Sequence, residues 1–322
     1  GERSRVSFER MAKNDVPLAV REVLRRTGQS RLDYVGFSMG GMLLYAALAL
    51  RTVDPDALRR VAIIGAPGQV AAPFRVLGVL ARVWPLWLVP PIWLDVPSRL
   101  VAFAAGHVVT PIHRHIIEPK ALSARDVAAA LITIRDVPRP LFVDFARFVR
   151  LGRLVVDGVE VLPALASLTI PAVFVAGAAD RVAPPGAVRA AHDAWGAAVP
   201  GIEKDWHLAS HATGAFADYG HCDLAFGTHA PIDVFPIVLQ KAVMLLKCDA
   251  AYLAFIDKQS GQLVYRATHG GLDRILGAGI PLGEGVDGAV AQTGKPHVTE
   301  SYAGDTQRMT RDKKESEVQK EV

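Results

Sequence analysis

The chain has 322 residues, a formal net charge of +4 and an apolar fraction of 51%, so it can form two domains with a large core. Its arginines are scattered and form no basic run interleaved with aromatic residues, which argues against a nucleic-acid partner. Two cysteines, Cys222 and Cys248, are too few for a disulfide scaffold and favour a cytoplasmic protein. The most apolar stretch, 83–94, contains three prolines and is too short to span a bilayer, so peripheral membrane attachment remains an alternative.

The first predicted elements surround a glycine-rich turn. Apolar residues at helical spacing predict a helix over 15–27 with Gly28 as its C-cap. A short apolar run at 32–35 predicts a strand, and 41–50 predicts a helix. The turn between them, Gly36–Gly40, fits the pattern G-x-S-x-G.

This pattern between a strand and a helix is typical of a nucleophile elbow, in which a tight turn projects a serine hydroxyl above the sheet. We therefore predict Ser38 as a nucleophile, with glycines beside it because backbone segments approach closely. The backbone N–H of Met39, at the start of the helix, would stabilise an oxyanion. The alternative is a glycine-rich turn that contains serine by chance.

Two further apolar runs, 60–65 and 171–177, predict buried parallel strands and so an α/β sheet. The roughly 100 residues between them, 68–168, are too long for a simple crossover, and we interpret them as an inserted helical cap over the site. We expect its aromatic residues to line an apolar pocket, although packing in a core is nearly as well supported. The predicted substrate-binding residues are Phe37, Trp84, Trp87 and Trp93.

A serine nucleophile on such a sheet requires an acid and then a base, in that chain order. Asp180 follows the strand 171–177 in a loop and is the predicted acid; a turn or N-cap role is the alternative. His221 lies in a loop after a strand predicted at 205–212 and is the predicted base. The histidines placed less favourably for this role are His192, His207, His211 and His229.

Together, the segments Gly36–Gly41, Asp180–Pro184 and Tyr219–Gly227 resemble those of α/β-hydrolases. The histidine segment, continued to Phe235, is similar to the acid lipase and cholesteryl-esterase branch. The resemblance covers about 1–240. It implies a serine esterase or lipase that uses a Ser-His-Asp triad on an ester or lipid, without a cofactor or a metal.

Members of that family have additional strands before the elbow strand, and a loop among them supplies a second oxyanion donor. Few residues precede Ser38 here, so we expect a partial sheet that lacks its first strands and has an exposed edge. Loss of one oxyanion donor typically lowers the rate by about 10²–10³, so weak or absent activity is expected of this chain.

The C-terminal third has a different pattern. A helix at 239–246, strands at 250–257 and 262–267, and a glycine-flanked helix after Gly283-Glu284-Gly285 resemble the first part of a GAF domain. The resemblance implies a small α+β module that binds an unidentified small ligand or forms a homodimer. The glycines lack the pattern of a phosphate-binding loop.

The sequence thus predicts a partial α/β-hydrolase domain at 1–237 and a partial GAF-like domain at 238–322, joined by a nearly continuous helix. Two alternatives remain open: a non-catalytic signalling protein that acts through the GAF-like module, and an acyltransferase on the same fold.

Overall fold

The computed structural model describes residues 6–70, 136–227, 229–237, 249–257, 260–295 and 297. The chain divides into two compact units, Gly1–Val234 and Phe235–Val322. Among the described residues, no helix is both long and apolar enough to cross a membrane.

The first unit contains a four-stranded parallel sheet in the order β1-β2-β5-β6. Its strands are β1 (Leu32–Phe37), β2 (Leu58–Ile64), β5 (Ala172–Gly177) and β6 (Lys204–Ala209). All six residues of β5 are buried, as expected for an inner strand covered on both faces. Within the described part of the chain, β1 and β6 form the two edges. The predicted α/β class with a parallel sheet is therefore confirmed.

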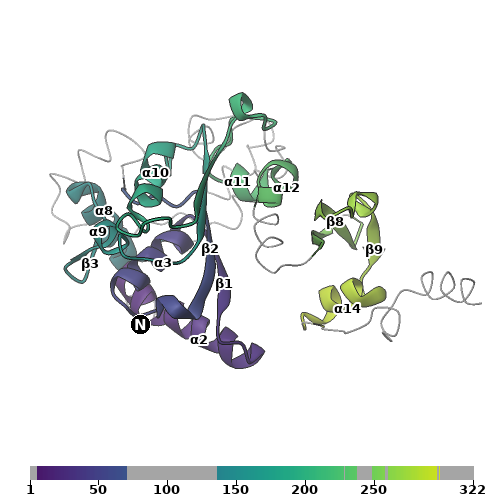
Figure 1. Ribbon diagram of the computed structural model, residues 1–322, viewed down its shortest axis with the longest axis horizontal. Coiled ribbons are helices and arrows are strands. Elements are labelled where there is room, and N and C mark those ends of the chain that lie inside the picture. The colour runs from purple at the N-terminus through teal and green to yellow at the C-terminus, as the bar shows by residue number, and fades with distance from the viewer. Residues whose placement is uncertain are drawn as a thin grey trace, which may run out of the picture. The chain divides into compact units, whose positions relative to one another are not determined.

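Helices lie on both sides of this sheet, with more of them on one side than on the other (Figure 1). The helices on one side are α3 (Met39–Ala49), α8 (Arg139–Leu151), α9 (Val161–Ala164) and α10 (Pro185–Ala194). On the other side lie α11 (Asp223–Phe226) and α12 (Ala230–Asp233). The N-terminal segment contributes α1 (Phe8–Arg10), η2 (Met11–Asp15) and α2 (Val16–Thr27).

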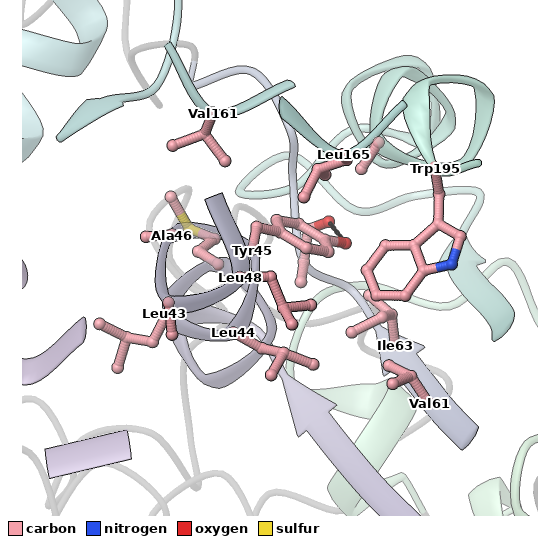
Figure 2. Packing of buried hydrophobic residues seen from close by; sticks show 14 of the residues in the cluster. Leu43, Leu44, Tyr45, Ala46, Leu48, Val61, Ile63, Val161, Leu165 and Trp195 are labelled. Atoms are coloured by element: carbon pink, nitrogen blue, oxygen red, sulfur yellow. Dashed lines mark hydrogen bonds between the residues drawn. The ribbon is translucent and has the colours of Figure 1, made fainter. Parts of the chain in front are cut away.

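The main core forms around α3, which is buried at every position from Gly41 to Leu48. A helix that is apolar all round must lie inside the protein. Tyr45 of α3 meets Trp195 edge-on, with ring centroids 6.3 Å apart, and both rings are fully buried (Figure 2). Their polar atoms have partners: the Tyr45 hydroxyl donates to the Ala66 carbonyl and the Trp195 indole N–H to the Ile170 carbonyl. This packing fixes the helix that begins directly after Ser38.

The described end of the predicted cap belongs to this core. Beyond α8, a short hairpin of β3 (Val155–Val156) and β4 (Val159–Glu160) leads into α9. Phe148 of α8 is fully buried and packs edge-on against Phe8 of α1, with ring centroids 5.2 Å apart. Phe145 lies 5.9 Å from both of these rings. The structure thus favours the core role that the sequence left open for the aromatic residues of the cap, because Phe145 and Phe148 pack against the N-terminal segment.

Several predicted boundaries differ from those in the structure. The strand expected over 205–212 ends at Ala209, and His211 begins the short helix η5 (His211–Thr213). In the region of the nearly continuous helix expected between the domains, α12 ends at Asp233 with Val234 as its C-cap, and residues 235–237 are again helical. Residues 238–248, the rest of that predicted helix, lie outside the described residues.

The second unit contains a three-stranded antiparallel sheet in the order β7-β8-β9. Its elements are β7 (Ala251–Asp257), β8 (Gln262–His269), η6 (Asp273–Ile275), β9 (Gly279–Pro281) and α14 (Gly285–Thr293). A Cβ on Gly283 would lie 2.7 Å from the Gln292 side-chain oxygen, and one on Gly288 would lie 2.5 Å from the Pro281 carbonyl oxygen. These two glycines therefore permit close packing of α14 on the loop before it.

Candidate active site

Ser38 occupies a strained turn between β1 and α3. It has φ of 52° and ψ of −124°, a conformation that costs a non-glycine residue about 1–3 kcal/mol and is concentrated at functional sites. The surrounding backbone holds it there: Ser38 N–H donates to the Ile64 carbonyl at 2.9 Å, and Gly41 N–H donates to the Ser38 carbonyl at 3.1 Å. The core packing of α3 thus maintains the strain at Ser38.

The glycines around Ser38 do not all have the same role. A Cβ on Gly36 would lie 2.8 Å from Gly41 Cα, and one on Gly41 would lie 2.5 Å from Ala66 Cβ. Gly40, the last glycine of the sequence pattern, would meet no described atom within 4 Å. Close approach therefore explains Gly36 and Gly41, and the prediction that it also explains Gly40 is wrong.

Met39 is the first residue of α3. Its backbone N–H belongs to the first turn, where N–H groups have no acceptor within the helix. Since the partial positive charge of a helix lies at this end, the N–H is suited to an anionic oxygen attached beside Ser38.

Asp180 lies in the loop after β5 and is only 3% exposed. Its Oδ1 accepts hydrogen bonds from the backbone N–H groups of Val182 at 2.9 Å and Ala183 at 2.7 Å. Its Oδ2 lies 2.8 Å from His221 Nδ1. One oxygen therefore organises the loop, as in the predicted alternative of a turn aspartate, while the other oxygen contacts the histidine.

His221 connects Asp180 to Ser38. Its Nε2 lies 2.7 Å from Ser38 Oγ, across 183 residues of sequence, and the side chain is buried. The loops after β1, β5 and β6 all leave the same edge of the parallel sheet, which brings the three side chains together. With Nδ1–H donating to Asp180, Nε2 is the acceptor for the serine hydroxyl.

The other candidate histidines lie elsewhere. His207 is in β6 and His211 is in η5. His192 of α10 contacts Asp193 and packs against Phe174 and Trp206. His229 stacks on Phe216 with ring centroids 3.6 Å apart.

Cys222 is the residue after His221, yet its environment does not favour a nucleophilic thiol. Burial, supplemented by the carboxylates of Asp223 and Asp180, raises the pKa of Cys222 to about 12. At neutral pH it is therefore a protonated thiol and a poor nucleophile.

An aromatic ring lies beside His221, and a second aromatic ring packs on the first. Phe37, predicted as a substrate-binding residue, packs beside the His221 ring with centroids 5.2 Å apart. Phe226 of α11 meets Phe37 edge-on at 6.2 Å and is 63% exposed. The sequence analysis did not single out Phe226, because only the fold shows that it lies next to Phe37. The three predicted tryptophans lie outside the described residues: Trp84, Trp87 and Trp93.

Gly65 is a second residue that the sequence analysis did not assign to the site. It follows β2 with φ of 56°, and a Cβ there would lie 3.6 Å from both Asp180 Oδ2 and His221 Cε1. The signal in the sequence was a glycine that ends a buried parallel strand, which is where loops approach a site at the sheet edge.

Among the described residues, no group of three or more His, Cys, Asp or Glu side chains could hold a metal ion.

No protein-family model and no curated protein matches the sequence. Among solved structures, the chain is similar to a monoacylglycerol lipase from Paleococcus ferrophilus at 13% identity, over 76% of this chain and 78% of that one, with a TM-score of 0.47. It is similar to a thermophilic esterase from Thermogutta terrifontis (14% identity, 75% of this chain and 72% of that one, TM-score 0.43). A third similar structure is an enol-lactonase from Burkholderia xenovorans LB400 (14% identity, 75% of this chain and 74% of that one, TM-score 0.42). At these identities and scores, the similarities carry no argument about activity.

Proposed function

We propose that this chain is a serine hydrolase of the α/β-hydrolase type that acts on carboxylic esters. The observation that carries the proposal is the continuous hydrogen-bonded path from Ser38 Oγ to His221 Nε2 at 2.7 Å and from His221 Nδ1 to Asp180 Oδ2 at 2.8 Å. A serine beside a base that is oriented by a third group is the geometry of an activated nucleophile.

In the proposed reaction, Ser38 Oγ attacks the ester carbonyl carbon while its proton passes to His221 Nε2. Asp180 holds the imidazole in the required tautomer and stabilises the imidazolium that forms. Collapse of the tetrahedral intermediate breaks the bond to the alcohol oxygen, which takes the proton from His221. Water then attacks the acyl-enzyme with His221 as base, and this step releases the acid and regenerates Ser38.

Met39 N–H is the proposed donor to the oxyanion of both tetrahedral intermediates. It is the backbone N–H directly after the nucleophile, at the positive end of α3. One such donor is worth about 10²–10³ in rate, so this contribution is large enough to measure.

The surroundings of the site favour an ester with an apolar group. Phe37 lies beside His221, and the largely exposed Phe226, which packs on Phe37, extends this aromatic surface. Trp84, Trp87 and Trp93 remain proposed as further substrate contacts. We expect no cofactor, because the proposed steps transfer only an acyl group and protons.

Labelling the full 322-residue chain with a fluorophosphonate tests the proposal directly. We expect adduct on Ser38, located by peptide mass spectrometry, and none in Ser38→Ala or His221→Ala. Hydrolysis of p-nitrophenyl acetate should depend on the same two residues. Because weak activity is expected of this chain, labelling is continued at high probe concentration until it stops increasing. A wild-type chain that still takes up no label would refute the assignment of Ser38, and an undiminished rate in Ser38→Ala would refute its role in hydrolysis.

An acyltransferase would carry out the same first step. Adding a small alcohol and separating the products distinguishes the two outcomes: free acid indicates hydrolysis, and predominant new ester indicates transfer.

For the second unit, the proposal remains a GAF-like module that binds a small ligand or forms a homodimer, and it is supported by the hairpin β7–β8 and the helix α14. Sedimentation of the chain over a range of concentrations tests the dimer.

A further inference from the structure

The loop that carries His221 is anchored to α12 by one carboxylate oxygen. Asp233 Oδ2 accepts a hydrogen bond from the Tyr219 hydroxyl at 2.6 Å and another from Phe216 N–H at 2.8 Å. Tyr219 lies two residues before His221, and its side chain is fully buried. Asp233 thus fixes the loop at two positions, and the second is next to the active site.

The backbone of Tyr219 connects this anchor to the loop of the catalytic acid. Its carbonyl accepts a hydrogen bond at 3.0 Å from the N–H of Ala179, the residue before Asp180. A Cβ on Gly177 would lie only 2.3 Å from the same carbonyl oxygen, so the end of β5 lies directly against it. A shift of Tyr219 therefore changes the separation between the histidine loop and the acid loop.

A second carboxylate holds the same turn from the other side. Asp223 is fully buried, and its Oδ2 accepts a hydrogen bond from Gly220 N–H at 2.9 Å. His221 is thus preceded by two residues that are each bound by an aspartate, one through its side chain and one through its backbone.

We propose that Asp233 is a positioning residue for His221, acting through Tyr219; the catalytic part of this inference rests on the proposed hydrolase function. Asp233 does not contact the reacting atoms. It holds the Tyr219 hydroxyl, which sets the position of the Tyr219 carbonyl and so the fit of the His221 ring between Asp180 and Ser38. Displacements of about 1 Å far from the chemistry can lower a rate by 10²-fold.

Loss of Asp233 would remove the acceptor of the Tyr219 hydroxyl. Burial, and secondarily the hydrogen bond to Asp233, raise the pKa of Tyr219, so the phenol remains a donor throughout the usual assay range. A buried donor without an acceptor is unfavourable, and the ring must move toward water to satisfy it. That movement pulls the Tyr219 carbonyl away from Ala179 and His221 away from its two partners.

Four variants of the full chain test this inference. Asp233→Ala removes the acceptor, and Asp233→Asn keeps an oxygen that can accept both hydrogen bonds. Tyr219→Phe removes only the hydroxyl. Asp144→Ala is the matched control, because the Asp144 carboxylate also accepts a backbone N–H, that of Phe8 at 2.9 Å, at a place remote from His221.

For p-nitrophenyl acetate, we expect Asp233→Ala to lower kcat and the rate of fluorophosphonate labelling by about 10- to 100-fold, with KM within about twofold of wild type. Asp233→Asn should restore both to within about threefold, and Tyr219→Phe should show an intermediate loss. Asp144→Ala should lower the unfolding temperature but leave kcat at the wild-type value.

Proton NMR provides a readout that does not depend on turnover. The Nδ1–H proton of a histidine hydrogen-bonded to a carboxylate resonates far downfield. We expect this signal in the wild type and in Asp233→Asn, and its loss or broadening in Asp233→Ala. A wild-type chain that neither labels nor hydrolyses would refute the proposed function, while the NMR comparison would still decide the structural role of Asp233.

Three results would overturn the inference: an Asp233→Ala chain with wild-type kcat and downfield signal, an Asp233→Asn chain as impaired as Asp233→Ala, or a change in KM alone. If Asp233→Ala does not fold, Tyr219→Phe decides. A folded Tyr219→Phe chain with unchanged kcat and signal would rule out the path through the hydroxyl.

Discussion

Gly40 and Gly41 provide a sharp test of how the turn at Ser38 is built, because they are adjacent in α3 but differ in their surroundings. Alanine at Gly40 would meet no described atom within 4 Å, whereas the Cβ of alanine at Gly41 would lie 2.5 Å from Ala66 Cβ. Ordinary contacts between such atoms lie at about 3.5–4.0 Å, so α3 or Ala66 must move by about 1 Å.

The expected free energies follow from this difference. Replacing glycine by alanine inside a helix stabilises a protein by about 0.5–1 kcal/mol, and we expect this gain for Gly40→Ala. Overpacking a core costs about 1–3 kcal/mol, so Gly41→Ala should be destabilised by up to about 2.5 kcal/mol after the same helix gain. Ala66 is fully buried and its carbonyl accepts the Tyr45 hydroxyl, so we expect the start of α3 to take up much of the shift.

Urea unfolding and fluorophosphonate labelling together measure both effects. A shift of about 1 Å at the start of α3 would break the 2.7 Å contact between Ser38 and His221, so labelling of Gly41→Ala should slow by up to about 100-fold. Gly40→Ala should label at the wild-type rate. The reasoning is refuted if Gly41→Ala is as stable as Gly40→Ala and labels normally, or if Gly40→Ala is the impaired variant.

Three further outcomes are expected. Gly177→Ala should slow fluorophosphonate labelling by about 10²-fold, because its Cβ would lie 2.3 Å from the Tyr219 carbonyl oxygen. The control is Gly186→Ala in α10, whose Cβ would meet no described atom within 4 Å; this variant should label at the wild-type rate. Cys222, with its pKa raised to about 12, should have only about one thiolate in a thousand at pH 9. Peptide mapping after iodoacetamide treatment should therefore find Cys222 unmodified in the native chain and modified in urea. Rapid modification of the native chain at pH 8 would contradict the raised pKa of this thiol. Phe148→Ala should lower the free energy of unfolding by about 3–5 kcal/mol and reduce the hydrolysis of acetate and octanoate esters equally. A loss of activity on octanoate esters alone would instead indicate that Phe148 lines a pocket for the acyl chain.

The sequence was sufficient to predict the parallel strands and the turn at Ser38. Both follow from local chemistry: continuous apolar runs that end in glycine are typical of strands buried on both faces. The sequence also indicated Asp180 and His221 as partners of Ser38, because each lies in a loop after a predicted strand and the three follow the chain order known for this arrangement. The strands and the turn need only the neighbours of each residue along the chain.

The packing partner of α8 could be identified only from the tertiary structure. Phe145 and Phe148 have the apolar character expected of either a pocket or a core, and the sequence left both alternatives open. The structure places both against Phe8, a partner about 140 residues away in the chain. Periodicity identifies which face of a helix is apolar, but it does not identify the segment that covers that face.

Sequence by itself determined the residue types that can perform acyl chemistry and the loops that carry them. The sequence already favoured His221 over His207 and His211, and the tertiary structure supplied the 2.7 Å contact with Ser38. Tertiary structure alone decided that Gly41 rather than Gly40 is the tightly packed glycine and that Asp233 anchors the histidine loop. The physical reason is that hydrogen bonds and close contacts require atoms within about 3–4 Å of each other, and only the folding of distant segments onto one another sets those distances.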